Sequence, residues 1–373
     1  MKKFISAVFK GLLLVFCLAL SAAFLLNFVL DSGEARKSDV GAAVSYEIMD
    51  RYDTYVTNTR SDALEGVLSI KKVYWLSDDD LIAPEPDQDK FGETDDPSTL
   101  QWLLDDAAEL LDGQETLFNT DVRLFRDSKV TYYLDETIFA VTWKEAINNT
   151  VYTISEVKIA DPSQFRRFLA DGVFASGSKY AGREMAESVN AVVASSGDYY
   201  SFRNMGIIVY DSQLMRMEGF WMDTCFIDAN GDLQFVHKGE IMDEAVAEQY
   251  VKDHGVRFSL AFGPILIEDG VVQKIPATYP VGEGDVCNPR MAIGQLGELH
   301  YLLVAVSAEP PYEYGHTLKQ LAAKMADFGC IQAYNLDGGG TATLVMNDKL
   351  MNYVFERMIG DIIYFATAVP DGE

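Results

Sequence analysis

The chain opens with an apolar run and then alternates between acidic, helical and strand-like patterns. Residues 11–30 are almost entirely apolar, with Ser21 and Asn27 as the exceptions, and a run of about 20 residues matches the hydrocarbon thickness of a bilayer. Basic residues precede the run and acidic residues follow it, namely Lys2, Lys3 and Lys10, then Asp31 and Glu34. This asymmetry predicts that residues 1–30 form a cytoplasmic tip and an uncleaved transmembrane anchor, with the remainder extracellular. A cleaved signal peptide is the alternative, but the run is long for one.

The following segment, residues 31–128, has no sustained strand period and is predicted to be an extracytoplasmic stalk or accessory segment. Within it, residues 77–96 are rich in acidic side chains and include Pro84 and Pro86, a composition typical of a solvated linker. Residues 98–112 repeat leucine and alanine at helical spacing, with Ser98 as a candidate N-cap.

From residue 129 onward the pattern changes to short apolar and alternating runs separated by turn residues. Asn148 and Asn149 lie between two β-rich runs, and Glu-Asp-Gly at 268–270 lies between two more, so each predicts an antiparallel hairpin. Residues 164–170 follow a strand-breaking Asp-Pro-Ser and are predicted to form a short helix. Strands are predicted at 130–143, 151–159, 207–210, 233–236, 262–267, 271–275, 331–336 and 341–346.

The clearest helix of this region covers residues 317–328. Thr317 and Gln320 can form a capping box before it, and Gly329 follows as a C-terminal cap. Strands outnumber helices, and hairpins surround this helix. We therefore predict that residues 129–373 form one α+β domain, with a mixed or antiparallel β-sheet and packed helices, preceded by one transmembrane helix.

Composition narrows the classes of function. The formal net charge is −27 over 373 residues, which provides no field to attract nucleic acid or anionic lipid headgroups. Outside the apolar run the cysteines are Cys225, Cys287 and Cys330, too few and too irregular for a disulfide scaffold or a CxxC zinc site. The histidines show no metal-ligand spacing either. The sequence therefore requires no cofactor, and a divalent cation such as calcium is left open.

Candidate chemistry lies at three places. Residues 335–341 read Asn-Leu-Asp-Gly-Gly-Gly-Thr, and successive glycines suit close approach of backbone to a ligand better than a core; a turn with an Asx-type carboxylate is the alternative. Asp198 lies beside Tyr199 and Tyr200, a group that fits either a sugar-binding wall or a loop with core tyrosines. Arg290 precedes an apolar strand and is either a phosphate anchor or part of a surface ion pair.

Taken in order, these motifs resemble the phosphodiester glycosidase family, which includes a lysosomal enzyme acting on N-acetylglucosamine phosphodiesters and bacterial members related to exopolysaccharides. The resemblance runs from about residue 129 to the C-terminus, and the anchor followed by a variable segment is similar to Gram-positive members. Its markers are Gly-Asp-Tyr-Tyr at 197–200, Phe-Gly-Pro at 262–264 with the Asp-Gly hairpin at 269–270, Pro-Arg-Met-Ala-Ile-Gly at 289–294, Gly-His-Thr-Leu at 315–318, the run at 335–341 and Glu-Arg at 356–357.

The resemblance implies a hydrolase that cleaves the glycosidic bond of a sugar-1-phosphodiester, releasing the sugar and leaving a phosphomonoester. It implies that Asp337 stabilises or attacks the oxocarbenium-like carbon, with Asp198 as its partner, while a cation holds the leaving phosphate. Asn335 orients the carboxylate in this interpretation. Substrate contacts are assigned to Tyr199, Tyr200, Arg290, Asn335, Gly338, Gly339, Gly340, Thr341 and Arg357.

Two departures from the family pattern keep a second function open. The strand at 302–306 runs into Ser-Ala-Glu-Pro-Pro, where family members often carry Asp-Gly-Arg, and Thr341 stands where the family usually has serine. A basic residue expected near the substrate is thus missing from the sequence. The alternative is a non-catalytic glycan-binding or exopolysaccharide assembly protein of the same fold. Either function implies a cell-surface glycan as partner, a single-pass membrane location and no nucleic acid.

Overall fold

The described part of the chain lies within one compact unit. The computed structural model describes residue 76 and residues 82–280, 282–311 and 315–369, all of which belong to the second of two units, Val44–Glu373. The predicted anchor at 11–30, the segment before residue 76 and the start of the acidic linker lie outside the described residues. Among those that are described, no helix combines the length and the apolar character needed to cross a membrane.

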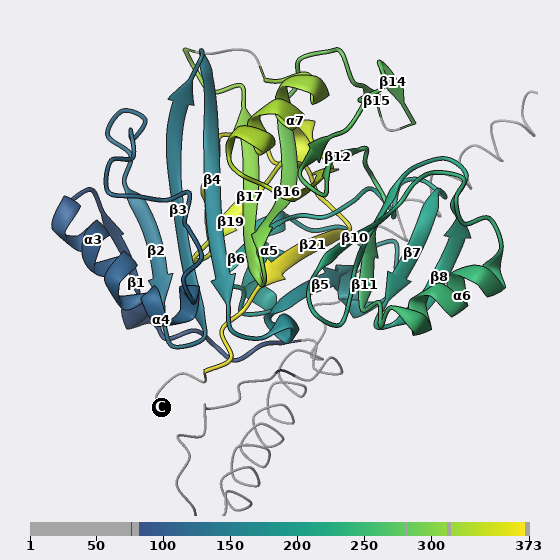
Figure 1. Cartoon of the computed structure of the whole chain (residues 1–373), viewed down its shortest axis with the longest axis horizontal. Helices are drawn as coiled ribbons and strands as arrows, with labels where there is room; N and C mark the ends of the chain where they lie inside the picture. Colours follow the sequence, from purple (N-terminus) through teal and green to yellow (C-terminus); the bar gives the residue numbers. More distant parts are fainter. Residues whose placement is uncertain (1–75, 77–81, 281, 312–314, 370–373) are drawn as a thin grey trace, which may run out of the picture. The chain divides into compact units, whose positions relative to one another are not determined.

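The larger layer is a nine-stranded sheet whose neighbouring strands are paired antiparallel throughout (Figure 1). In spatial order its strands are β1 (Phe91–Thr94), β2 (Val130–Leu134), β3 (Ile138–Ile147), β4 (Thr150–Ile159), β17 (His300–Ser307), β16 (Arg290–Gly297), β18 (Gln332–Leu336), β12 (Ile265–Glu268) and β13 (Val271–Val272).

Smaller sheets complete the strand content of the described residues. A five-stranded sheet has the order β20 (Lys349–Leu350), β19 (Leu344–Met346), β6 (Val193–Ser196), β21 (Asp361–Phe365) and β5 (Phe165–Leu169). A three-stranded sheet contains β10 (Leu233–Val236), β9 (Thr224–Ile227) and β11 (Phe258–Leu260). Two ribbons pair β7 (Gly206–Tyr210) with β8 (Gln213–Glu218), and β14 (Thr278–Tyr279) with β15 (Gly282–Glu283).

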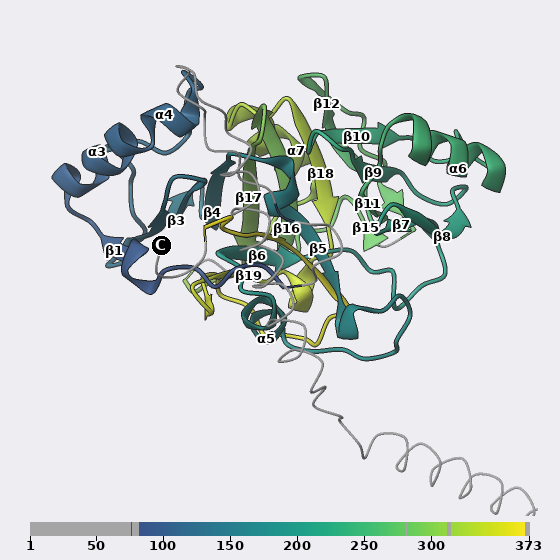
Figure 2. The same ribbon diagram turned by 90° about the horizontal axis from the view of Figure 1, so that it is seen from below.

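Short helices cover the outer faces of these sheets (Figures 1 and 2). The α-helices are α3 (Pro97–Asp106), α4 (Ala108–Leu111), α5 (Gly182–Ser188), α6 (Glu244–Asp253) and α7 (Leu318–Asp327); the 3-10 turns are η1 (Gln88–Lys90), η2 (Pro162–Gln164), η3 (Ala170–Gly172) and η4 (Gly339–Thr341). The sheet-rich α+β architecture with few helices is therefore confirmed, and of the two expected sheet forms the described strand pairs have the antiparallel one.

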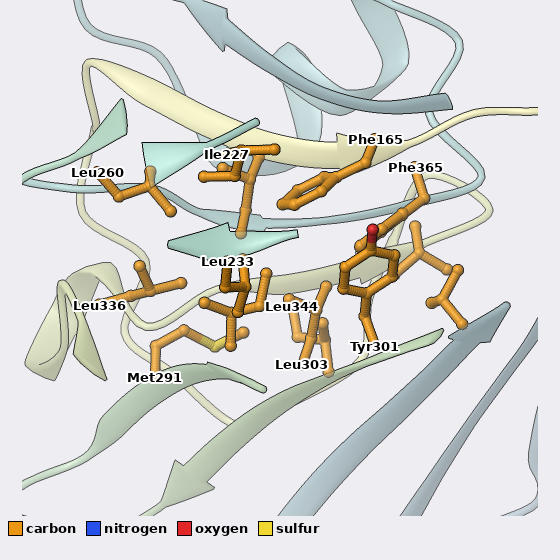
Figure 3. Packing of buried hydrophobic residues seen from close by; sticks show 14 of the residues in the cluster. Phe165, Ile227, Leu233, Leu260, Met291, Tyr301, Leu303, Leu336, Leu344 and Phe365 are labelled. Carbon is orange, nitrogen blue, oxygen red and sulfur yellow. The ribbon is translucent and has the colours of Figure 1, made fainter. Parts of the chain in front are cut away.

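The main core lies between the inner faces of the sheets (Figure 3). It joins Leu303 and Leu336 of the nine-stranded sheet to Phe165 and Leu344 of the five-stranded sheet, and Leu260 of the three-stranded sheet packs into the same cluster. A second core on the outer face of the large sheet contains apolar residues of α3, α4 and α7. Because both faces of the central strands are buried, these strands read as nearly continuous apolar runs in the sequence.

Several local predictions are confirmed. Asn148 and Asn149 both have positive φ in the turn between β3 and β4, as a two-residue hairpin turn requires. Thr317 caps α7, with a reciprocal capping box to Gln320, and Gly329 has a φ of +84° just beyond it. These signals are local, so the chain around them folds as the residues alone predict.

Other predictions are wrong. Within the helix predicted at 164–170, Phe165–Leu169 form strand β5, which pairs with β21. Phe91–Thr94, within the predicted linker, forms strand β1 at the edge of the large sheet. The N-cap of α3 is Asp96, whose carboxylate accepts from the Thr99 N–H, and Ser98 does not cap it. The strand predicted at 341–346 begins only at Leu344, after the 3-10 turn η4.

Candidate active site

Asp337 follows β18 at the edge of the large sheet, where its main chain links two loops. Its N–H donates to Gly197 O at 3.2 Å, and its carbonyl accepts from Ser196 Oγ at 3.3 Å. Ser196 ends strand β6 of the five-stranded sheet, and Gly197 begins the Asp198 loop. The two aspartates found from the sequence are therefore held on adjoining loops, one from each sheet.

The Asp337 carboxyl group is buried and nearly uncompensated. Burial, with a smaller contribution from nearby Asp198, raises its pKa to about 7 despite the lowering effects of Thr341, Arg357 and the Gly338 backbone. The Arg357 guanidinium lies 3.9 Å from Asp337 Oδ2, and the Arg357 side chain is 52% exposed where the Asp337 side chain is 9% exposed. A carboxyl group that changes charge near neutral pH, with a half-exposed cation beside it, is typical of a functional site.

The three glycines after Asp337 allow close backbone contacts. A Cβ on Gly338 would lie 2.8 Å from Pro289 O, and one on Gly340 would lie 3.2 Å from Phe355 O. Gly339 has a φ of +64°, a conformation that favours glycine, and its N–H donates to Pro289 O at 2.9 Å. The Gly339 N–H is thus already used within the protein, which does not favour the predicted substrate contact through this group.

Asn335 and Thr341 support the loop on either side of Asp337. Asn335 Nδ2 donates to Gly263 O at 2.7 Å, so its amide holds the Gly263 turn and does not bind the Asp337 carboxyl group. Asn335 Oδ1 is buried without a hydrogen-bond partner among the described residues. Thr341 Oγ1 donates to Gly338 O at 2.6 Å, which closes the glycine turn.

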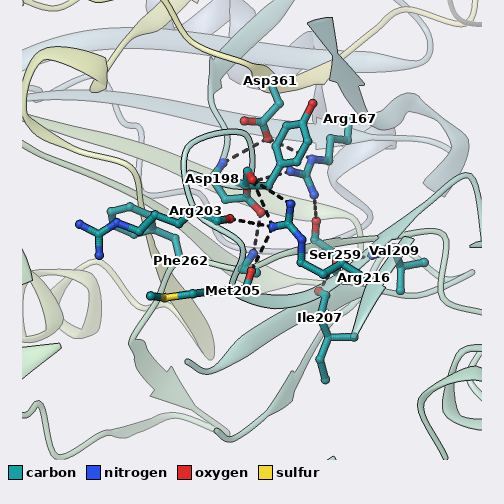
Figure 4. Close-up of polar contacts among 12 residues, drawn as sticks. Arg167, Asp198, Arg203, Met205, Ile207, Val209, Arg216, Ser259, Phe262 and Asp361 are labelled. Atoms are coloured by element: carbon teal, nitrogen blue, oxygen red, sulfur yellow. Dashed lines mark hydrogen bonds and ion pairs between the residues drawn. The ribbon is translucent and has the colours of Figure 1, made fainter. Parts of the chain in front are cut away.

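Asp198 belongs to a buried ion cluster (Figure 4). Its Oδ1 lies 2.9 Å from Arg167 Nη2 and accepts from the Tyr200 N–H at 2.8 Å, while its Oδ2 accepts from the Ala261 N–H at 2.7 Å. Its side chain is fully buried. Both carboxylate oxygens are bound and neither is exposed. The geometry therefore supports a structural role for Asp198 and does not support the predicted catalytic role.

Arg167 and Asp361 complete this cluster, and the sequence analysis missed both. Arg167 Nη2 lies 2.8 Å from Asp361 Oδ2, and Arg167 Nη1 donates to Ser259 O. Asp361 Oδ2 also accepts from the Asp198 N–H at 3.1 Å, and burial raises the pKa of Asp361. A signal existed in the sequence, because an arginine inside the apolar segment 164–170 needs a buried carboxylate as partner.

The two tyrosines differ in access. Tyr200 is buried, stacks on Phe174 with ring centroids 5.4 Å apart, and lies under the Arg167 guanidinium, so it is a core residue. Tyr199 is half-buried and stacks on exposed Phe202 with centroids 4.4 Å apart. Of the predicted aromatic wall, only Tyr199 is therefore placed to meet a ligand.

Arg290 is held by backbone carbonyls. Its Nε donates to His316 O at 2.9 Å, and its Nη2 donates to Val286 O at 2.7 Å and Glu283 O at 3.2 Å. Burial lowers the pKa of this guanidinium. Arg290 thus fastens the 283–286 loop to the start of α7, and Arg357 is the cation that the structure brings to Asp337. Across the described ranges, no group of three or more His, Cys, Asp or Glu side chains is arranged to hold a metal ion.

Comparisons with known proteins agree with the motifs. Residues 189–366 match the model of the phosphodiester glycosidase family. The SPbeta prophage-derived uncharacterized protein YomE of Bacillus subtilis is 25% identical over 198 residues, which is 51% of this chain but only 30% of that relative's length. Among solved structures, the zebrafish N-acetylglucosamine-1-phosphodiester alpha-N-acetylglucosaminidase catalytic domain, auto-inhibited by its pro-peptide, is 19% identical with a TM-score of 0.49, covering 69% of this chain and 92% of that one.

A hypothetical protein from Synechocystis is 13% identical with a TM-score of 0.45, over 66% of this chain and 64% of that chain. The family match is the finding on which the assignment depends. It covers the Asp198 loop, the Arg290 strand, the glycine turn and Arg357. Residues 189–366 are therefore similar to the phosphodiester glycosidase family, and this similarity supports a glycosidase-type function.

Proposed function

We propose that this protein is a membrane-anchored extracytoplasmic hydrolase that cleaves the glycosidic bond of sugar-1-phosphodiesters in cell-surface glycans. The observation that carries this proposal is the buried Asp337 carboxyl group, with its pKa raised to about 7 and Arg357 at 3.9 Å. The apolar run at 11–30 supports the anchor. The family match supports a sugar phosphodiester as substrate class.

The proposed reaction breaks the bond between the anomeric carbon and the phosphate oxygen. The electron pair of that bond leaves with the phosphate, a water oxygen adds to the anomeric carbon, and the water loses one proton to solvent. The products are the free sugar and a phosphomonoester. A phosphate leaving group is stable as an anion, so it needs little protonation. Ionised Asp337 stabilises the positive charge that develops at the anomeric carbon.

Arg357 serves the leaving phosphate in this proposal. Its side chain is half-exposed and its guanidinium lies 3.9 Å from Asp337 Oδ2, so it can move to an arriving phosphate. Its backbone N–H donates to Gly340 O at 2.8 Å, which ties the residue to the glycine turn. A guanidinium binds two phosphate oxygens at once and stays charged at any working pH. Tyr199 offers an aromatic face for the sugar.

A second candidate function is a non-catalytic glycan-binding or exopolysaccharide assembly protein. The observation favouring it is that three backbone carbonyls occupy Arg290, the cation expected at the phosphate. With the expected Asp-Gly-Arg also missing, Arg357 is left as the cation for catalysis. A binding protein would hold the glycan and release no sugar.

The test is sugar release by the full-length chain in detergent. UDP-N-acetylglucosamine and a panel of sugar-1-phosphodiesters are incubated with the wild type, Asp337→Asn and Asp269→Asn, with and without calcium. Asp269 is a matched control, because it also precedes a glycine and its N–H donates to Gln332 at the opposite end of β18. Release that is lost only in Asp337→Asn supports the hydrolase. Glycan binding without release from any substrate favours the second candidate.

A further inference from the structure

We infer that a second site, on the inner face of the large sheet, binds an uncharged sugar residue of the same glycan. The site is a cavity of about 340 Å³ that opens beside β2, β3 and β4. Four hydroxyl side chains line it, namely Ser128, Thr131, Thr142 and Thr153. Met351, just after β20, contributes apolar surface. This volume is within the range of small-molecule sites.

Two of these hydroxyl groups lack partners. Ser128 Oγ and Thr153 Oγ1 are buried and form no hydrogen bond with any described residue. Thr142 Oγ1, in contrast, is bonded to Ser155 Oγ at 2.8 Å. Buried polar atoms in folded proteins are nearly always hydrogen-bonded, so unpaired hydroxyls at a cavity indicate a partner that enters from it. A hydroxyl both donates and accepts, which suits the hydroxyls of a sugar.

The charges around the cavity balance, which argues against an ionic ligand. Lys144 Nζ lies 3.2 Å from Glu309 Oε2, and Glu93 Oε1 lies 3.1 Å from Lys349 Nζ. The remaining charged lining residues, Asp127 and Lys129, have opposite signs. The cavity therefore offers no excess charge to a phosphate or an amine, and hydrogen-bonding groups predominate on its floor.

Strand register relates this cavity to Asp337. Leu336, the residue before Asp337, pairs with Met291, Met291 pairs with Ala305, and Ala305 pairs with Thr153. These residues form one row across β18, β16, β17 and β4, which are neighbours in the large sheet. Strands β16, β17 and β4 lie side by side in Figure 1. Three strand steps of about 4.8 Å place Thr153 roughly 14 Å from the start of the candidate active site.

Ser307 adds another hydroxyl close to the row. Ser307 lies two residues after Ala305 on β17 and hence on the same face, and its Oγ is also buried without a partner among the described residues. A separation of this size exceeds one sugar ring, so an occupant of both sites is an oligomer. This inference rests on the proposed function for the identity of the glycan: one residue sits in the cavity while the phosphodiester of a neighbouring repeat lies at Asp337.

The test uses binding, so that it does not depend on turnover. Neutral oligosaccharides of glucose, galactose and N-acetylglucosamine are titrated into the full-length Asp337→Asn protein by calorimetry. The same titration is made after adding Thr153→Val or Ser128→Ala. Thr224→Val is the matched control, because Thr224 Oγ1 is also buried and unpaired but belongs to β9, outside the cavity. Thermal unfolding checks that each variant is folded.

We expect at least one oligosaccharide to bind, and its affinity to fall at least tenfold with Thr153→Val or Ser128→Ala and to stay unchanged with Thr224→Val. No binding by any oligosaccharide, or equal affinity in all folded variants, overturns the inference. Sugar release from phosphodiesters is measured on proteins that carry the same cavity substitutions but keep Asp337. Binding without release contradicts the proposed hydrolase alone, whereas release without oligosaccharide binding contradicts the second site alone.

Discussion

Asp337 and Asp198 are the same residue type on adjoining loops, yet their surroundings differ completely. Asp198 receives two backbone N–H groups and the Arg167 guanidinium, and its side chain is fully buried. Asp337 is buried with a half-exposed guanidinium at 3.9 Å, and its pKa is raised to about 7. The comparison teaches that a neighbouring glycine does not distinguish a reactive carboxylate from a structural one. What distinguishes them is the number of hydrogen-bond donors that each carboxylate receives.

The largest expected effect is on turnover by Asp337→Asn. Removing the carboxylate should lower sugar release at least 1000-fold, about 4 kcal/mol of transition-state stabilisation. Folding should be preserved, because the amide replaces a buried carboxyl group that already favours its neutral form. Initial rates and thermal unfolding, measured on one preparation, test this. If the folded variant kept its activity, Asp337 would not be the catalytic carboxylate, and its proposed difference from Asp198 would be wrong.

Arg167→Met should instead reduce stability by about 3–5 kcal/mol, because it leaves Asp198 and Asp361 buried without their cation. Denaturant unfolding measures the change. The matched control is Arg183→Met, since Arg183 is 54% exposed and lies 4.0 Å from Glu356; that change should cost less than about 1 kcal/mol. Equal effects of the two substitutions would show that the buried cluster is not a structural support.

The pH dependence gives a smaller, signed effect. The folded pKa of Asp337, about 7, lies above its ordinary value of 3.8, so between these values the folded state holds more protons than the unfolded state. The stabilising contribution is full below pH 4 and is lost as pH rises through about 7. The free energy of unfolding of the wild type should therefore fall with pH relative to Asp337→Asn. Asp361, whose pKa is also raised, is common to both proteins and cancels in this difference.

Activity should change in the opposite direction over the same range. If Asp337 acts as a carboxylate, kcat/KM rises with pH through about 7. A rate that falls through this range would assign Asp337 the role of a general acid.

The smallest expected effect is that of Arg357→Gln. We expect about a tenfold loss of kcat/KM, because the guanidinium is half-exposed and its distance from Asp337 is long. Loss of the cation should also move the rise of the pH–rate profile to higher pH, since Arg357 lowers the pKa of Asp337. Arg357→Lys, which keeps the charge, should retain the wild-type profile. An unchanged pH–rate profile in Arg357→Gln would show that the guanidinium does not affect the ionisation of Asp337.

Sequence reasoning succeeded where structure depends on near neighbours. The capping box at Thr317 and the turn at Asn148 depend on residues a few positions apart. It failed at β5, where Phe165, Phe168 and Leu169 have helical spacing but the segment is buried on both faces. The same limit applies to the site: the turn at Asp337 was identified from its glycines, whereas the place of Asp198 depends on Ala261, 63 residues away, and on Arg167.

Strand β1 has a consequence for the edge of the large sheet. It comes from the acidic segment, caps the edge of β2 through its pairing at Phe91–Thr94, and carries Glu93, which pairs with Lys349. Charged side chains on an outermost strand discourage the strand-to-strand pairing that starts aggregation. A shortened chain beginning at residue 129 would expose the buried strand β2, rich in β-branched and aromatic residues, as a template for other chains. The acidic segment thus protects the sheet against self-association.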